Sequence, residues 1–255
     1  MKTSLFGSLG AMLLGAMAMQ ANGQSLKLND VGYFEDRGVN ILVYSNLYNG
    51  GFCDEKLAGL EIIQRGERIS TGGGVRLMNT PEQWDIYALM TNRTVNKEQG
   101  YIEVDLNYEQ YDFTYKLRVT PKDKGALVQI ILDKPVPEKL VGKAGMNLEF
   151  FPASYFGKNY LMDGAARILP KYPQHDTEVL PIAEKIPQYF GESTFDDRGR
   201  GEFLSALPLA TGKQITLAPE DPNLCVNIQT DNELNLYDGR LLAQNGTFVV
   251  RELLP

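Results

Sequence analysis

The chain has 255 residues, 43% of which are hydrophobic, and it carries a formal net charge of −7 at pH 7. This hydrophobic content excludes a disordered chain, and the length allows one large β domain or two small ones. The acidic balance leaves no basic face for a nucleic-acid partner and disfavours a polyanionic substrate, whereas a neutral sugar would be indifferent to it.

The N-terminus has the features of an export signal. Lys2 supplies a positive charge, residues 5–19 form an apolar run, and residues 21–23 offer small side chains at a cleavage site. The run is shorter than the ~20 residues that span a bilayer, which favours cleavage over an uncleaved anchor. We therefore predict a signal peptide over residues 1–23, a mature chain that begins at Gln24, and an exported protein, periplasmic or extracellular, with no membrane association after cleavage.

Short strands are predicted early in the mature chain. Residues 39–44 and 60–64 are apolar runs, each bounded by turn signals. The run Thr71-Gly72-Gly73-Gly74 lacks the lysine and the hydroxyl residue of a phosphate-binding loop, and no helical pattern follows it. We interpret it as a flexible connection before a strand over residues 75–78.

Residues 95–133 are predicted to form a three-stranded antiparallel meander. Residues 101–108 alternate strictly between apolar and polar side chains, and residues 113–119 repeat the pattern after a short break. Residues 127–132 form a third strand rich in branched apolar side chains. The alternation predicts that Glu103 lies on the polar face of the first of these strands.

The middle of the chain changes character at a proline. Residues 147–151 form a strand that Pro152 ends or places at a sheet edge. Residues 164–211 are rich in proline, glycine and charge, and we predict a long irregular loop region there, of a kind that is usually functional or packed on another domain. Further strands are predicted over residues 214–217, 224–229, 233–237 and 247–253.

No segment shows a sustained helical period, although residues 81–90 could hold one helical turn. The predicted fold class is therefore all-β: one large antiparallel β-sandwich over residues 24–255 with a long irregular loop region. The apolar end, from Phe248 to Pro255, resembles a strand in progress, whereas domains usually end in polar residues. We expect the chain to be the N-terminal part of a longer protein.

Few residues are candidates for catalysis. His175 is the only histidine, and a lone histidine in a loop is more often a surface residue than a base. Cys53 and Cys225 are interpreted as two buried thiols rather than a disulfide, with pairing as the alternative. They lack the spacing of metal ligands, so we predict neither a metal site nor another cofactor.

Carboxylates and aromatic rings gather in the central region. Glycoside hydrolysis needs two carboxylates about 5–10 Å apart, and Glu149, Asp163, Asp196 and Asp197 are the acids available there. An ion-paired loop is the favoured interpretation of the last two. Aromatic rings stack on the apolar C–H faces of sugars but also fill cores, and both uses stay open. The candidates for carbohydrate binding are Trp84, Tyr155, Phe156, Tyr160, Asp163, Asp197 and Arg198.

Eight short motifs are spread over nearly the whole mature chain. They are Leu28-Asn29-Asp30 with Tyr33-Phe34-Glu35, Asp54-Glu55-Lys56, Asn79-Thr80-Pro81-Glu82-Gln83-Trp84-Asp85, Asn147-Leu148-Glu149-Phe150 with Pro152-Ala153-Ser154-Tyr155-Phe156, Tyr160-Leu161-Met162-Asp163-Gly164, Thr194-Phe195-Asp196-Asp197-Arg198-Gly199-Arg200, Leu217-Ala218-Pro219-Glu220-Asp221 and Ala243-Gln244-Asn245-Gly246. Together they resemble the N-terminal region of secreted bacterial family 9 glycoside hydrolases, which are cellulase-like endoglucanases.

The resemblance implies a β-sandwich followed, in the same polypeptide, by an immunoglobulin-like module and an (α/α)6 catalytic barrel. That family activates water with an Asp-Ala-Gly-Asp motif, and Asp163-Gly164-Ala165-Ala166 lacks its second acid. No catalytic residue therefore carries over. The implied function is an accessory β-sandwich, non-catalytic alone, whose partners are the downstream domains and β-glucan oligosaccharides.

Two alternatives stay open. One is a stand-alone carbohydrate-binding module, whose affinity for cello-oligosaccharides would depend on Trp84 or Tyr155. The other is a sandwich-fold sugar epimerase or lyase, in which Asp163, Asp197 or His175 acts as acid or base.

Overall fold

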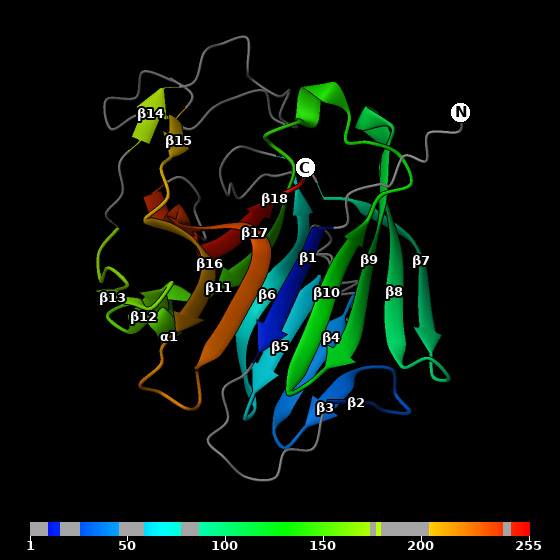
Figure 1. Cartoon of the computed structure of the whole chain (residues 1–255), viewed down its shortest axis with the longest axis horizontal. Coiled ribbons are helices and arrows are strands. Elements are labelled where there is room, and N and C mark those ends of the chain that lie inside the picture. Colours follow the sequence, from blue (N-terminus) through cyan, green and yellow to red (C-terminus); the bar gives the residue numbers. More distant parts are fainter. Residues whose placement is uncertain are drawn as a thin grey trace, which may run out of the picture.

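The computed structural model describes residues 10–15, 26–45, 59–77, 87–173, 177–179, 204–241 and 246–255. Every strand pair in this part of the chain is antiparallel, and the strands form the two layers of a β-sandwich (Figure 1). The predicted all-β fold class is confirmed. No helix in the described ranges is long and apolar enough to cross a membrane.

The larger layer, here the long sheet, has eleven strands. Its main path follows β2 (Lys27–Leu28), β3 (Phe34–Asp36), β4 (Val39–Val43), β5 (Leu60–Gln64), β6 (Glu67–Arg76), β11 (Gly145–Phe150), β18 (Phe248–Leu253) and β17 (Val226–Asp238). Beyond β17 it continues through β16 (Ala210–Leu217), β12 (Asn159–Met162) and β13 (Ala165–Ile168).

The smaller layer, here the meander sheet, has four strands in chain order. They are β7 (Leu89–Asn96), β8 (Tyr101–Tyr108), β9 (Phe113–Lys122) and β10 (Gly125–Ile131). The predicted meander over residues 95–133 is confirmed, and β7 adds a fourth strand to it. The strand β1 (Gly10–Gly15) lies between β10 and β17 and joins the two layers into one hydrogen-bonded network.

The remaining elements are short. β14 (Thr177–Val179) pairs only with β15 (Leu204–Ala206) in the described chain. One α-helix, α1 (Pro152–Tyr155), and the 3-10 turns η1 (Glu109–Tyr111), η2 (Glu138–Leu140) and η4 (Gly239–Leu241) occur between strands. Proline at the first helical position suits α1, because the missing N–H would have no partner there.

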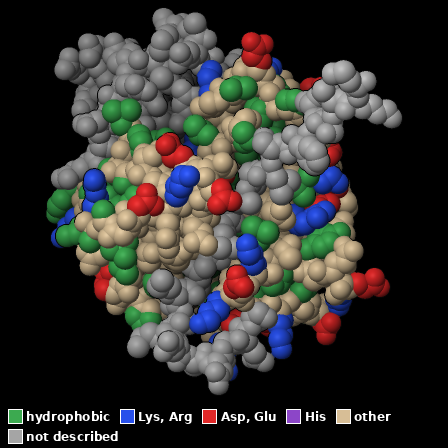
Figure 2. Space-filling view, viewed as in Figure 1, with side chains coloured by type: hydrophobic (Ala, Val, Ile, Leu, Met, Phe, Trp, Pro, Cys, Tyr) green, Lys and Arg blue, Asp and Glu red, His purple; other side chains and the backbone are tan. Residues whose placement is uncertain are grey.

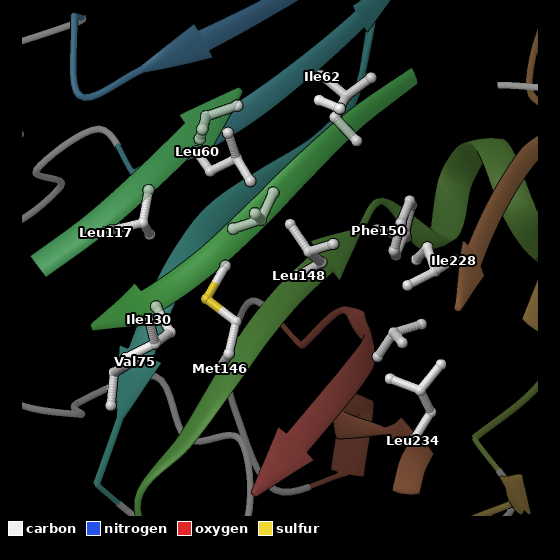
Figure 3. Packing of buried hydrophobic residues seen from close by; sticks show 14 of the residues in the cluster. Leu60, Ile62, Val75, Leu117, Ile130, Met146, Leu148, Phe150, Ile228 and Leu234 are labelled. Atoms are coloured by element: carbon white, nitrogen blue, oxygen red, sulfur yellow. The ribbon is translucent and has the colours of Figure 1, made fainter. Parts of the chain in front are cut away.

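The core lies between the two layers. Apolar residues at alternate positions of strands such as β8, β9 and β10 point inward, as Leu117 and Ile130 of the meander sheet do toward Leu60, Val75 and Leu148 of the long sheet (Figure 3). All five side chains are buried. Strict alternation in β8, where apolar residues are buried and polar ones half-buried, produces the predicted two-faced strand.

The structure corrects the interpretation of the glycine run. Residues 71–74 lie inside β6 rather than in a flexible connection. A Cβ at Gly72 would lie 2.7 Å from the Glu149 carboxylate, and one at Gly73 would lie 2.6 Å from the Leu60 Cβ. Glycines are therefore needed where neighbouring strands approach closely, which is a use of glycine in strands that composition does not reveal.

Further expectations are corrected. The separate strands predicted over residues 224–229 and 233–237 are one continuous strand, β17, whose exposed residues in the middle mimic a turn in the sequence. The region 164–211 is not wholly irregular, because β13, β14 and β15 fall within it. The helical turn considered for residues 81–90 is not formed over residues 87–90, and residues 78–86 lie outside the described ranges.

Candidate functional site

Tyr155, predicted as a sugar-stacking residue, is part of the core. Its side chain is buried, its hydroxyl donates a hydrogen bond to the Leu224 carbonyl at 2.7 Å, and its ring packs edge-on against Phe150. Burial raises the pKa of Tyr155 above its ordinary value of 10.0. A ring without a solvent-facing side cannot stack on a sugar, so the prediction for this residue is wrong.

The neighbouring aromatic candidates divide between core and surface. Tyr160 lies in β12 with 2% of its surface exposed, so it also belongs to the core and is corrected in the same way. Phe156 follows α1 and is 43% exposed, which leaves its ring available for a ligand. The sequence spacing of these aromatic residues cannot tell core residues from sugar-binding ones, because aromatic rings serve both purposes.

Asp163 anchors the turn between β12 and β13 to the strand β16. It has a left-handed backbone conformation at the turn between β12 and β13, and its Oδ1 accepts hydrogen bonds from the backbone N–H groups of Lys213 and Gln214, both at 2.9 Å. Aspartate tolerates this conformation and commonly bonds nearby backbone groups. The geometry gives the Oδ1 atom a structural role, while the side chain is exposed, so Asp163 as a carbohydrate ligand or as an acid or base stays a prediction.

The remaining candidates lie outside the described residues. They are Trp84, Asp197 and Arg198, together with His175 and Cys53. The second cysteine, Cys225, is buried.

A cluster of polar side chains that we did not predict as a unit lies on the strands β6, β11 and β18. This central polar cluster consists of Arg76, Asn147, Glu149 and Arg251. Arg76 Nη2 lies 3.5 Å from Glu149 Oε1, and its guanidinium lies 3.9 Å from the centre of the Tyr87 ring. The register places Asn147 opposite both Gly74 and Arg251.

The cluster is built for structure more than for acid–base chemistry. Asn147 and Arg251 are 1% and 0% exposed, and the Arg251 guanidinium donates to the Lys143 carbonyl. Neither polar atom of the Asn147 side chain has a hydrogen-bond partner within the part of the chain that the structure describes. Two guanidinium groups and one carboxylate do not supply the carboxylate pair of a glycoside hydrolase.

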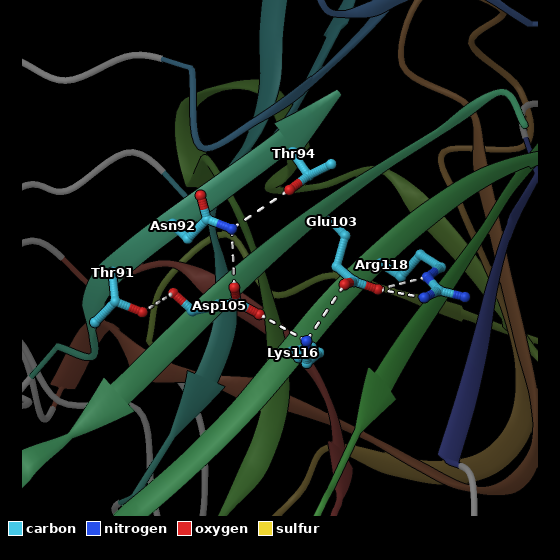
Figure 4. Close-up of polar contacts among 7 residues, drawn as sticks. All are labelled: Thr91, Asn92, Thr94, Glu103, Asp105, Lys116 and Arg118. Carbon is cyan, nitrogen blue, oxygen red and sulfur yellow. Dashed lines mark hydrogen bonds and ion pairs between the residues drawn. The ribbon is translucent and has the colours of Figure 1, made fainter. Parts of the chain in front are cut away.

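The outer face of β7, β8 and β9 carries the second polar group, here the meander face (Figure 4). Arg118 Nε donates to Glu103 Oε2 at 2.6 Å, and Lys116 Nζ lies 3.2 Å from Asp105 Oδ1. Asn92 Nδ2 donates to Asp105 Oδ2 at 3.0 Å. These side chains form one connected row across three neighbouring strands.

The meander face is open to solvent and has no dominant sign of charge. Lys116 and Arg118 have side chains 36% and 35% exposed, and the Arg118 guanidinium lies 4.5 Å from the centre of the Tyr101 ring. Acidic and basic side chains are interspersed on the side of the molecule that Figure 2 presents. The face thus offers carboxylate, amide, ammonium and guanidinium groups beside an aromatic ring.

The electrostatics of the row favour the charged forms of Asp105 and Lys116. Burial by itself would raise the pKa of Asp105, but the hydrogen bonds from Asn92 and Lys116 and the charge of Lys116 outweigh it and hold that pKa below its ordinary value. The pKa of Lys116 is raised, chiefly by its hydrogen bond to Asp105. Sequence alternation predicted the polar side of β8, but only the register reveals which residues of β9 face it.

Comparison with known proteins adds no relative: no family model, no curated protein and no solved structure matches this chain.

Proposed function

We propose that this chain is a non-catalytic β-sandwich of a secreted, family 9-like glycoside hydrolase, and that it contacts β-glucan through the meander face. The immunoglobulin-like module and the catalytic barrel of the same polypeptide are its proposed partners. The motif resemblance and the two-layer antiparallel fold support this proposal. The meander face is the single observation that carries the contact with sugar.

The chemistry of the meander face suits a neutral polyol. Sugar hydroxyl groups both donate and accept hydrogen bonds, and Asn92, Asp105 and Lys116 present an amide, an acceptor and a donor in one row. Charged partners make these hydrogen bonds stronger than neutral ones. Tyr101 at one end adds an apolar ring to the row.

The test is a titration of the purified mature chain with cellohexaose and soluble β-glucan, followed by calorimetry and affinity electrophoresis. The variant D105A/K116A removes the centre of the row and is expected to weaken binding by tenfold or more, about 1.4 kcal/mol. The control K158A/D221A removes an ion pair of similar length and exposure, at 2.8 Å and with side chains 33% and 23% exposed, from the far end of the long sheet.

Equal binding by wild type and both variants would show that sugar binds elsewhere, and no binding by the wild type would remove the proposed contact with glucan. Release of reducing sugar from β-glucan by the purified chain would overturn the non-catalytic part of the proposal. A binding wild type that loses affinity only in D105A/K116A supports the meander face.

A further inference from the structure

One strand of the sandwich comes from the segment that the sequence predicts to be removed. β1 pairs with β10 over six residues, from Gly10 opposite Ile130 to Gly15 opposite Gly125. It also pairs with β17, from Met12 opposite Thr230 to Gly15 opposite Asn227. β10 and β17 do not pair with each other. Figure 1 shows β1 in blue between these two strands.

Without β1 the hydrogen-bonded network separates into its eleven-stranded and four-stranded sheets. Two strand edges then face each other across a gap one strand wide. The backbone N–H and C=O groups along both edges would lose their partners, and unpaired buried backbone groups are costly. A chain that begins at Gln24 therefore lacks the strand between β10 and β17, and a gap one strand wide is left there.

The core-facing side of this gap is apolar, and the β10 edge lacks the usual protection against pairing. Ala126, Val128 and Ile130 of β10 are 0–4% exposed, and Ile228 of β17 is 0% exposed. β10 has the sequence Gly-Ala-Leu-Val-Gln-Ile-Ile, with no charge and no proline. Edge strands normally carry charged residues or proline, which prevent the addition of a further strand.

The present occupant defines the chemistry that fits. The register places Met12 opposite Val128 and Leu14 opposite Ala126 and Ile228, so these two apolar residues of the occupant lie opposite buried positions of its neighbours, while Leu13 between them lies opposite the exposed Gln229. Glycine lies at each end of the six-residue segment. A fitting ligand is an extended peptide of about six residues with apolar side chains at alternate positions.

We propose that the gap between β10 and β17 is a strand-binding site, which the leader occupies before cleavage and an extended apolar segment of a partner polypeptide occupies afterwards. The site rests on the exported, processed state that belongs to the proposed function. A second copy of the mature chain cannot fill it with β1, because that copy has lost the same segment. In the described part of residues 26–255, every strand already has its own place in a sheet.

The first experiment measures amide exchange in the protein purified after export, with its N-terminus determined by mass spectrometry. The probe is a synthetic peptide with the sequence of residues 8–17. Without the peptide, the backbone amides of β10 and β17 that face the gap are expected to exchange at least tenfold faster than the amides of β9. The peptide is expected to remove this difference. A control peptide with Met12→Asp and Leu14→Asp is expected to give no protection.

A second experiment tests the register. Gln229 is exposed and lies opposite Leu13. Mature Gln229→Cys is expected to form a disulfide with a peptide that carries Leu13→Cys. Asp231→Cys, which lies two residues further along β17 and has no partner in β1, is expected not to, because disulfide geometry tolerates little displacement. Protein without an added cysteine reports any background capture.

These experiments test the strand-binding site independently of the proposed binding of β-glucan. Slow exchange of these amides in the mature chain without peptide would overturn the site, since the chain would then close its own gap. Equal protection by both peptides, or equal capture at residues 229 and 231, would overturn it as well. An N-terminus that still contains residues 10–15 would contradict the predicted processing, on which the site depends, while glucan binding would still be tested independently.

Discussion

Two ion pairs on the outer faces of the two sheets show how differently the same residue types behave in this sandwich. On the meander face, Glu103 and Arg118 approach to 2.5 Å, and the Arg118 side chain is 35% exposed. In the central polar cluster, Glu149 and Arg76 are 3.5 Å apart, and the Arg76 side chain is 7% exposed. The shorter contact belongs to the better-hydrated cation.

The comparison separates contact distance from burial as the source of an ion pair's importance. Water can solvate Arg118 when its partner is removed, whereas Arg76 has little access to water. Exposed pairs are generally worth less than about 1 kcal/mol, while removal of one partner of a buried pair costs about 3–5 kcal/mol. The longer contact is therefore expected to matter more for folding.

The largest expected effect is that of Glu149→Leu. We expect this substitution to lower the free energy of unfolding by about 3 kcal/mol, because it leaves the Arg76 charge in a poorly hydrated place. The matched control is Glu103→Leu, for which we expect a loss below about 1 kcal/mol. Urea unfolding followed by circular dichroism measures both. A larger loss in the control would show that contact distance, not burial, decides.

The alternation of residues 101–108 and 113–119 predicted the meander sheet because one side faces water and the other the core, a pattern that a local sequence carries. The central polar cluster was not predictable in this way. Glu149 and Arg76 are 73 residues apart in the chain, and only the pairing of β11 with β6 brings them together. The sugar-stacking prediction for Tyr155 failed for a related reason. Its hydroxyl bonds to the carbonyl of Leu224, 69 residues further along the chain, and the residues next to Tyr155 in the sequence do not indicate this contact.

The second prediction concerns the space that Glu149 occupies. Gly72 has φ of +61°, and a Cβ there would lie 2.7 Å from the Glu149 carboxylate. We expect Gly72→Ala to destabilise the fold by about 2–3 kcal/mol, from backbone strain of about 1–2 kcal/mol and from displacement of the carboxylate.

Gly66→Ala is its control, because Gly66 also has a positive φ, +85°, but nothing lies within 4 Å of its Cβ position. Gly66→Ala is expected to lose only the stability that corresponds to backbone strain, about 1–2 kcal/mol. Equal losses in the two variants, measured by thermal and urea unfolding, would mean that the carboxylate moves aside without cost and that the cluster is looser than its burial indicates.

The third prediction uses the buried amide of the same cluster. Asn147 is 1% exposed, and neither polar atom of its side chain has a hydrogen-bond partner in the described ranges. We expect Asn147→Leu to stabilise the fold by about 1 kcal/mol, because an unsatisfied buried polar group is replaced by an apolar one.

Asn227→Leu serves as the opposite case. Its amide is also buried but donates to Thr216 Oγ1 at 2.8 Å, so the variant leaves a hydroxyl without its partner and is expected to destabilise by about 1 kcal/mol. If Asn147→Leu also destabilises in urea unfolding, the Asn147 amide has a stabilising role that its contacts do not show.

The smallest effect is expected from pH, and it has opposite signs on the two sheets. Burial raises the pKa of Glu252, on β18 of the long sheet, above its ordinary value of 4.5, against the hydrogen bonds it accepts. The folded protein then holds this proton more tightly than the unfolded chain, so the charge of Glu252 costs stability as pH rises from 4.5 through the raised value. Glu252→Gln should therefore gain stability relative to wild type as pH rises through that interval. Below the interval, the difference in stability between the two proteins should no longer depend on pH.

Asp105 on the meander face behaves in the opposite way. Its pKa is lowered in the folded state, so its contribution is present above the ordinary value of 3.8 and is lost as pH falls through the lowered value. We expect Asp105→Asn to be less stable than wild type at neutral pH and to approach it in acid. Urea midpoints of both variants between about pH 3 and pH 8 measure the two slopes. Slopes of the same sign would contradict the distinction between the sheets, because an acid desolvated by burial and an acid held by a neighbouring lysine must respond to protons in opposite directions.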